Sequence, residues 1–201
     1  MSTEASTLIL DPLRVFSLEL PELESPLRRG TLRTLLALSA GTVRVEGAER
    51  LAAAPEPSIF ALSHHNAWEA VLAPAALVAL RRGRLVRFLV DWMFVDLPWT
   101  GWLVRQLEPI PVYGKRAVFG ALSGKPSGRR ARRLRSLSSV ELAVAALDAG
   151  DDVGIYPEGR RNAQPHFLLR GRRGLGVVAL RSGAPVVPVG IDFDARDRLG
   201  R

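Results

Sequence analysis

The chain has no cysteine, very little lysine, and no hydrophobic run long enough to cross a membrane. Without cysteine it forms neither a disulfide scaffold nor a metal site built on thiolates. The longest apolar stretch, residues 70–80, contains Pro74 and is well below the ~20 residues that a membrane-spanning helix needs. The N-terminus carries Glu4 and Asp11 and has no basic segment before an apolar one, which argues against a secretory signal. These absences favour a chain on the cytoplasmic side.

Length and charge only loosely limit the number of domains and the possible binding partners. The 201 residues suffice for one domain with an ordinary core, and the 47% hydrophobic content argues against disorder. The formal net charge is +8, and of the 28 lysine and arginine residues only Lys115 and Lys125 are lysines. Arginine is suited to bidentate contacts with phosphate. The balance fits nucleic acid, anionic lipid headgroups or an acidic carrier protein, and equally a genome-wide preference for arginine, so charge alone does not choose among them.

Short β-type stretches alternate with helical ones. Residues 1–30, rich in proline, glutamate and leucine, are expected to form an N-terminal arm, and the folded domain, residues 31–201, is expected to start near Thr31. Hydrophobic patterns predict helices at residues 66–82, 136–149 and 173–182 and strands at residues 42–46, 58–63, 86–90, 108–112, 152–156 and 185–191. Such alternation predicts a single α/β domain with a mostly parallel central sheet flanked by helices. Ligands of such sheets bind beyond the carboxyl ends of the strands.

The most informative segment, residues 63–69, reads Ser-His-His-Asn-Ala-Trp-Glu and directly follows a predicted strand. An imidazole paired with a carboxylate is suited to remove a proton from a hydroxyl at neutral pH. Asn66 is a good N-cap, and with Glu69 it forms a capping-box pattern that turns the carboxylate back toward His64. Two interpretations stay open on this segment alone. Either His64 and Glu69 are a catalytic pair, or Glu69 only caps the helix and His64 is a structural histidine.

Further segments resemble motifs of the glycerolipid acyltransferase superfamily, typified by 1-acylglycerol-3-phosphate acyltransferase. His64 and Glu69 are similar to that family's first motif, His-x4-Asp, with glutamate in place of aspartate. Residues 156–162, Tyr-Pro-Glu-Gly-Arg-Arg-Asn, resemble its third motif, Phe-Pro-Glu-Gly-Thr-Arg-Ser. Residues 185–191 resemble its apolar fourth motif, which is commonly Val-Pro-Val with apolar neighbours. The resemblance covers residues 45–191 and implies an acyltransferase-like fold.

The second motif of that family is weaker in this chain. Residues 97–102 and 109–112 supply its proline-glycine approach and its strand, and the basic residues arrive slightly late, as Lys115 and Arg116. The resemblance implies that His64 is a general base and that Glu69 orients it. It also implies substrate contacts from a set of charged residues and one glycine: Lys115, Arg116, Glu158, Gly159, Arg160 and Arg161.

The implied activity is that of an enzyme. We expect an acyltransferase that moves a fatty acyl group from acyl-CoA or acyl carrier protein to a hydroxyl of a lysophospholipid or glycerol-phosphate type acceptor. No metal and no bound cofactor are implied, because the thioester co-substrate brings the activated group. Two alternatives stay open: an acyltransferase for a glycolipid or other phosphate-free alcohol, and a non-catalytic basic protein that binds membranes or nucleic acid. The arginine excess and the glutamate at position 69 motivate the second alternative.

Residues 125–135 are dominated by arginine. They form either a solvated basic loop or a docking patch for an anionic membrane or a carrier protein. The tryptophan-rich stretch between the first and second motifs fits shallow insertion at a bilayer interface, with most of its aromatic rings in the core. We therefore expect a lipid acceptor and an anionic membrane surface as partners, acyl carrier protein as a further candidate, and no nucleic acid. The expected location is peripheral, on the inner face of the membrane.

Overall fold

The computed structural model describes residues 7–9, 15–41, 43–65, 69–97, 100–112, 137–162 and 168–192. Its centre is a five-stranded parallel sheet of β3 (Ile59–Leu62), β4 (Val86–Asp91), β5 (Ile110–Val112), β6 (Asp152–Ile155) and β7 (Val186–Val189). The strands lie in the order β5-β4-β6-β3-β7. The described helices are α2 (Pro26–Leu38), α3 (Ala48–Ala52), α4 (Glu69–Leu80), α5 (Trp92–Asp96), α6 (Thr100–Gln106), α8 (Ser139–Asp148) and α9 (Gly174–Ser182). The predicted α/β class with a parallel sheet is confirmed.

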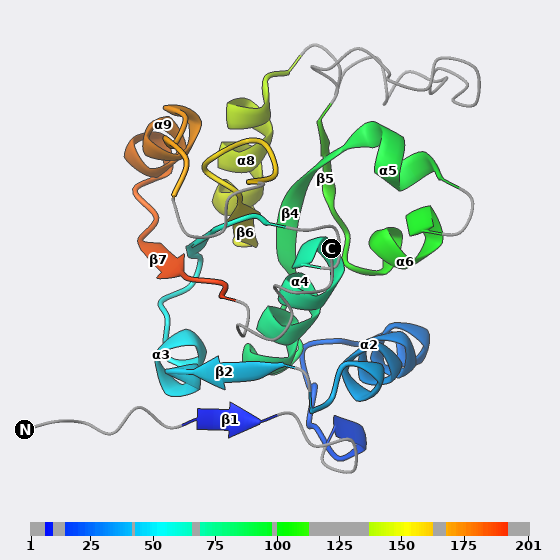
Figure 1. Cartoon of the computed structure of the whole chain (residues 1–201). Coiled ribbons are helices and arrows are strands. Elements are labelled where there is room, and N and C mark those ends of the chain that lie inside the picture. Colours follow the sequence, from blue (N-terminus) through cyan, green and yellow to red (C-terminus); the bar gives the residue numbers. More distant parts are fainter. Residues whose placement is uncertain are drawn as a thin grey trace, which may run out of the picture.

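Helices cover both faces of this sheet (Figure 1). Successive side chains of a strand point to opposite faces, so Ile59 and Phe60 lie in different halves of the core. Ile59 packs in the cluster that α8 and α9 complete, whereas Phe60 packs in the cluster that α3 and α4 complete. The apolar run of β3 is therefore buried on both sides, as a central parallel strand requires.

The N-terminal part of the chain differs from the expected arm. Helix α2 begins before Thr31, with Ser25 as its N-cap and proline at its first position. Leu20 and Leu23 are buried in a core that α2 and α4 share, because these leucines find apolar partners on two helices. The predicted strand at residues 42–46 is present as β2 (Arg44–Glu46). It pairs antiparallel with β1 (Thr7–Ile9) in a separate small sheet, outside the parallel one.

A buried charge network joins the amino ends of β3 and β6. The carboxylate of Asp152 is fully buried and accepts hydrogen bonds from the backbone N–H of Ser58 (2.8 Å), from Arg81 Nε (3.1 Å) and from Arg84 Nε (3.0 Å). Arg81 is itself buried and donates to the carbonyl of Ala54 at 2.6 Å. The network fixes the edge of the sheet opposite the carboxyl ends. In the part of the chain that the structure describes, no helix is both long and apolar enough to cross a membrane.

Candidate active site

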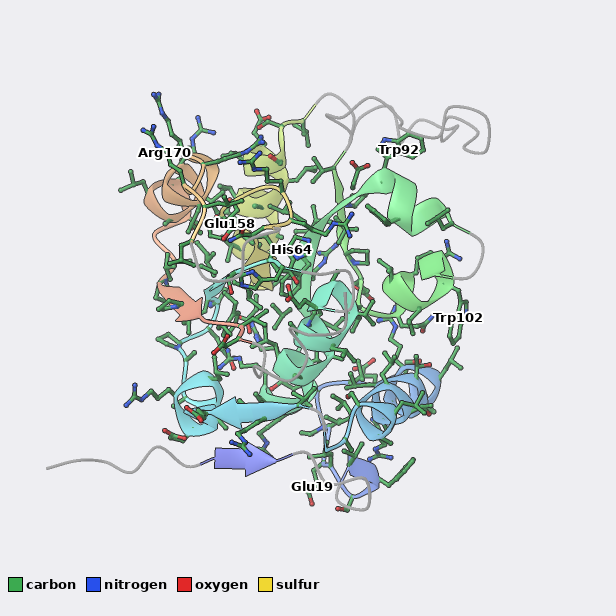
Figure 2. The ribbon with its side chains drawn as sticks, viewed as in Figure 1. Glu19, His64, Trp92, Trp102, Glu158 and Arg170 are labelled. Carbon is green, nitrogen blue, oxygen red and sulfur yellow. The ribbon has the colours of Figure 1, made fainter. Side chains whose placement is uncertain are left out.

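His64 lies just past the carboxyl end of β3, where its backbone is held by two neighbouring strand ends. Ser63 Oγ accepts a hydrogen bond from the backbone N–H of Ile191 at 3.0 Å, which ties β3 to the chain after β7. The backbone N–H of Asn162 donates to the carbonyl of His64 at 2.7 Å, which ties β3 to the chain after β6. The three segments that resemble the first, third and fourth motifs therefore meet at one edge of the sheet. Figure 2 shows His64 and Glu158 there.

The side chains of His64 and Glu69 face each other. Nδ1 of His64 is 3.3 Å from Oε2 of Glu69, and the backbone N–H of His65 donates to the same oxygen at 2.6 Å. Glu69 is the first residue of α4 and is only 5% exposed, and the positive end of the helix dipole stabilises its charge there. The carboxylate is thus turned back toward the preceding loop, as predicted. The proposed cap, Asn66, lies outside the described residues.

Tyr156 completes the surroundings of the histidine. Its ring stacks on that of His64 with 4.4 Å between centroids, and its hydroxyl donates to the backbone carbonyl of Glu69 at 3.3 Å. Burial, and then the charge of Glu69, raise the pKa of Tyr156, so the phenol stays neutral and remains a donor. The ring of Phe88 also contacts Tyr156, with 5.4 Å between centroids, and it occupies the space that a side chain at Gly154 would need. Tyr156 was not among the predicted site residues, although it is the first residue of the segment that resembles the third motif.

The turn after β6 depends on Gly159. The backbone N–H of Gly159 donates to the carbonyl of Tyr156 at 3.0 Å, and its φ of +62° is in the left-handed region that favours glycine. A Cβ at this position would lie 2.9 Å from Cδ and Nε of Arg172. Arg172 also anchors the turn through its backbone N–H, which donates to the carbonyl of Pro157 at 2.8 Å. The positive φ of the turn therefore favours glycine here, and the side chain of Arg172 packs closely over it.

The charged residues predicted to bind substrate are placed differently from one another. Glu158 is only 6% exposed, and its Oε2 has no hydrogen-bond partner among the described residues. Arg160 and Arg161 are exposed, and neither forms an ion pair with Glu158 in the described part of the chain. Glu158 therefore does not order these arginines in that part of the chain. Lys115 and Arg116 lie outside the described residues.

The model of the acyltransferase family matches residues 42–192, which is most of the chain and includes His64, Glu69 and the turn after β6. The chain belongs to the acyltransferase family. The predicted membership is thereby confirmed, and the protein is an enzyme that transfers acyl groups. No curated protein gives a significant match to the chain.

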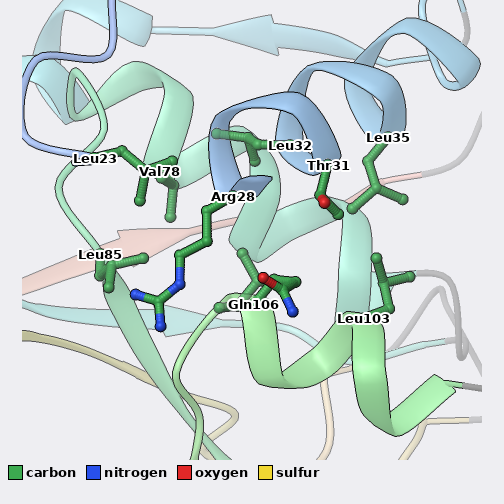
Figure 3. A pocket seen from close by; sticks show the side chains of 10 residues that line it. Leu23, Arg28, Thr31, Leu32, Leu35, Val78, Leu85, Leu103 and Gln106 are labelled. Carbon is green, nitrogen blue, oxygen red and sulfur yellow. The ribbon is translucent and has the colours of Figure 1, made fainter. Parts of the chain in front are cut away.

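A separate small cavity in this acyltransferase lies away from His64 (Figure 3). It is lined by leucines and other residues of α2, α4 and α6 and of the chain between them. Arg28 reaches into it between Leu85 and Gln106 and forms an ion pair with Glu108. None of its lining residues belongs to the candidate site. Within the described ranges, no group of three or more histidine, aspartate or glutamate residues is arranged to hold a metal ion.

The tryptophans of the acyltransferase fall into different environments. Trp92 is buried, in agreement with the expectation that most of these rings belong to the core. Trp102 is 45% exposed, and the neighbouring Phe94 is 55% exposed. Trp68 and Trp99 lie outside the described residues, as does the basic segment at residues 125–135, so the docking role expected of that segment stays a prediction.

Proposed function

We propose that this acyltransferase moves a fatty acyl group from acyl-CoA or acyl carrier protein to a hydroxyl of a lysophospholipid or glycerol-phosphate type acceptor. We further propose that it works at an anionic membrane surface, on the inner face, where such an acceptor resides. The observation that carries the proposal is the His64–Glu69 pair, with 3.3 Å between Nδ1 and Oε2, at the carboxyl edge of the sheet. Ligands of parallel sheets bind at that edge.

In this proposal His64 is the general base. With Nδ1 facing a carboxylate, the proton sits on Nδ1, and Nε2 keeps the lone pair that accepts the proton of the acceptor hydroxyl. The acceptor oxygen attacks the thioester carbonyl as that proton leaves, the tetrahedral intermediate collapses, and the C–S bond breaks. The imidazolium then returns the proton to the departing thiolate. An ester and a free thiol are formed in one direct displacement.

Glu69 and Tyr156 keep the base in one orientation. The carboxylate stabilises the imidazolium that forms during proton transfer, and the stacked phenol restricts rotation of the imidazole. Because both contacts exist before substrate binds, little reorganisation is needed at the moment of reaction. The side chain of His64 is 16% exposed, so the ring is held firmly and an edge remains accessible to a substrate.

The charged residues around the turn after β6 are proposed to bind the substrates. The unpartnered oxygen of Glu158 is suited to accept a hydrogen bond from an acceptor hydroxyl, since a buried acceptor without a donor is costly. Arg161 and Arg116 are proposed to hold the acceptor's phosphate, with Lys115 as a substitute for Arg116. Arg160, exposed beside Arg161, adds positive charge for a phosphate of the donor or the acceptor.

Substitutions of Glu69 separate its charge from its place in the turn. Glu69→Gln is expected to lower turnover by roughly ten- to a hundredfold, because loss of a charge-assisted contact to the imidazolium costs about 1.5–3 kcal/mol. Glu69→Asp is expected to retain more activity, since the shorter acid keeps the charge. The rate of thiol release measures both. Both variants should unfold at similar temperatures, because an amide oxygen still accepts the His65 N–H. Wild-type turnover in Glu69→Gln would leave Glu69 with only a structural role.

Substitution of Arg161 tests the phosphate site. Arg161→Ala is expected to raise the concentration of phosphate-bearing acceptor needed for half-maximal rate by roughly ten- to a hundredfold, from the loss of one charge-assisted contact. Slow hydrolysis of the thioester by water needs no acceptor and should change little. Arg116→Ala and Lys115→Ala test the other two residues proposed to hold the phosphate. Arg50→Ala, which removes an exposed arginine of α3, is the control and should leave the acceptor dependence unchanged. Unchanged acceptor dependence in all three site variants would contradict the phosphate assignment.

A panel of acceptors tests the proposed function as a whole. The purified chain is mixed with an acyl thioester and with lysophospholipid, glycerol phosphate or phosphate-free alcohols, including a glycolipid, and the free thiol is measured. We expect the highest kcat/KM with an acceptor that carries phosphate. A better rate with a phosphate-free alcohol would favour the glycolipid alternative. Absence of thiol release with every acceptor would show that the acceptor of this enzyme belongs to none of these classes.

A further inference from the structure

The outer face of α9 exposes apolar side chains to solvent, with an arginine at each end of the stripe. Arg173, Gly176, Val177, Leu180 and Arg181 are all exposed, and their spacing places them on one stripe of the helix. Leu180 is 89% exposed. The opposite side of the helix is buried in the core through Val178. Helix α9 therefore carries apolar side chains on both sides, and those on its outer side have no cover from the described part of the chain.

Basic residues surround this apolar stripe, and acidic ones are absent from its own segment. Residues 168–191 contain no aspartate or glutamate. Leu168, 82% exposed, and Arg170, also exposed, precede the helix, and Figure 2 shows Arg170 projecting outward beside α9. The acidic neighbour from another element is Glu141 of α8, whose pKa is lowered by its capping contacts with Ser138 and, more weakly, by Arg181. Arg170 and Arg173 form no ion pair within the part of the chain that the structure describes.

We propose that this surface, the α9 face, docks onto an anionic lipid bilayer. Its apolar members are Leu168, Val177 and Leu180, and its basic members are Arg170, Arg173 and Arg181. The leucines enter the boundary between headgroups and acyl chains, and the arginines contact lipid phosphates. This combination of exposed leucines and arginines is typical of a helix that lies in a membrane interface, which is held by burial of its apolar side chains and by electrostatic attraction to anionic lipids. The inference rests on the proposed membrane location, but it does not depend on the reaction.

The geometry favours lipid over other anionic partners. Nucleic acid would employ the arginines, but contacts to its phosphates give protruding leucines no role. A fluid interface accepts protruding side chains without a matching pocket, whereas a protein partner needs one. The α9 face also adjoins the candidate site, since the backbone N–H of Arg172 donates to Pro157 in the turn after β6. Docking through this face brings the edge of the sheet that carries His64 close to membrane-resident substrates.

Vesicle co-sedimentation of the full chain tests this docking face. Vesicles of phosphatidylcholine and phosphatidylglycerol should bind the wild type, and vesicles of phosphatidylcholine alone should bind it much less. Leu180→Ser and Leu168→Ser should each weaken binding by about tenfold, because each removes an apolar side chain from the interface. The double variant Arg170→Gln, Arg173→Gln should weaken it by about 25-fold at low salt, from about fivefold per arginine.

Matched control variants and a change of salt concentration separate the apolar contribution to vesicle binding from the electrostatic one. Leu38→Ser on α2 is the control for the leucines, because it removes a leucine that is 81% exposed elsewhere on the surface. The double variant Arg44→Gln, Arg50→Gln is the control for the arginines, because it removes two positive charges from exposed positions of β2 and α3. Both controls should bind vesicles as the wild type does. The arginine effect should vanish near 1 M salt, where the Debye length is about 3 Å, and the leucine effect should persist. Thiol release with glycerol phosphate and no vesicles should be unchanged in Leu180→Ser, which keeps this test separate from that of the reaction.

Several outcomes would overturn the proposal. If the wild type binds vesicles and the variants of the α9 face bind equally well, another surface docks, and a loss confined to Leu38→Ser would place it on α2. Equal binding to neutral and anionic vesicles would remove the role of charge. Tighter binding to duplex DNA or to acyl carrier protein than to vesicles, lost in the same variants, would assign the face to that partner.

Discussion

Replacing His64 with alanine is expected to lower acyl transfer by about 10²- to 10⁴-fold, the usual contribution of a general base. His65→Ala is expected to cost far less. The two neighbours differ because His64 presents its ring nitrogen to Glu69, whereas His65 contacts the same carboxylate through its backbone N–H, which alanine retains. Thiol release at saturating thioester and acceptor measures both variants.

Circular dichroism and thermal unfolding control for folding in that comparison. His64→Ala removes a ring that stacks on Tyr156, but the carbonyl that accepts from Asn162 belongs to the backbone and remains. The variant should therefore keep a cooperative unfolding transition. An inactive His65→Ala together with an active His64→Ala would show that the wrong histidine has been assigned.

Asp152→Ala is expected to lower the free energy of unfolding by about 3–5 kcal/mol, because it leaves the buried guanidinium of Arg81 without its fully buried counter-charge. Arg81 would keep its hydrogen bond to the carbonyl of Ala54, but its remaining counter-charge among the described residues would be Glu56, 3.2 Å away, which is half exposed and screened by water. For a domain of this size the unfolding midpoint should fall by about 10 °C. Denaturant unfolding followed by circular dichroism gives the free energy directly.

The adjacent Asp151 provides the control for that variant. Asp151 pairs with Arg87 at 2.6 Å, but its side chain is 35% exposed, so Asp151→Ala should cost no more than about 1 kcal/mol. The fraction of Asp152→Ala that stays folded should retain activity, since Asp152 lies at the amino ends of the strands and His64 lies past a carboxyl end. Equal, small losses for the two aspartates would contradict the importance assigned to the buried network.

Those parts of the fold that depend on neighbouring residues in the sequence were predictable. Buried parallel strands are short apolar runs, and β3, β6 and β7 lie within the ranges predicted for them. The pairing of His64 with Glu69 was predictable for the same reason, because one turn at the start of α4 brings the two together. Leu20 and Leu23 were not assigned to the core, since their burial depends on α2 packing against α4.

The remaining contacts depend on strand order, which alternation along the chain does not specify. Tyr156 stacks on His64 because β6 lies directly beside β3, although many residues separate them in sequence. The same adjacency brings Asn162 to the His64 carbonyl and joins Asp152 to Ser58. The sequence around Arg81 reads as an ordinary basic helix end, and nothing local marks it as buried. Its role follows only from the three-dimensional arrangement.

The measurement that tests the central claim most directly follows the acyl group itself. The purified chain is mixed with a thioester labelled in its acyl carbonyl and with lysophosphatidic acid, and the free thiol, the new ester and any protein-bound acyl group are quantified together. Direct transfer through His64 predicts that acceptor raises thiol release far above slow hydrolysis by water, that this additional thiol equals the ester formed, and that no acyl group appears on the protein. Acceptor-dependent thiol release without matching ester, or an acyl group attached to the chain, would contradict it.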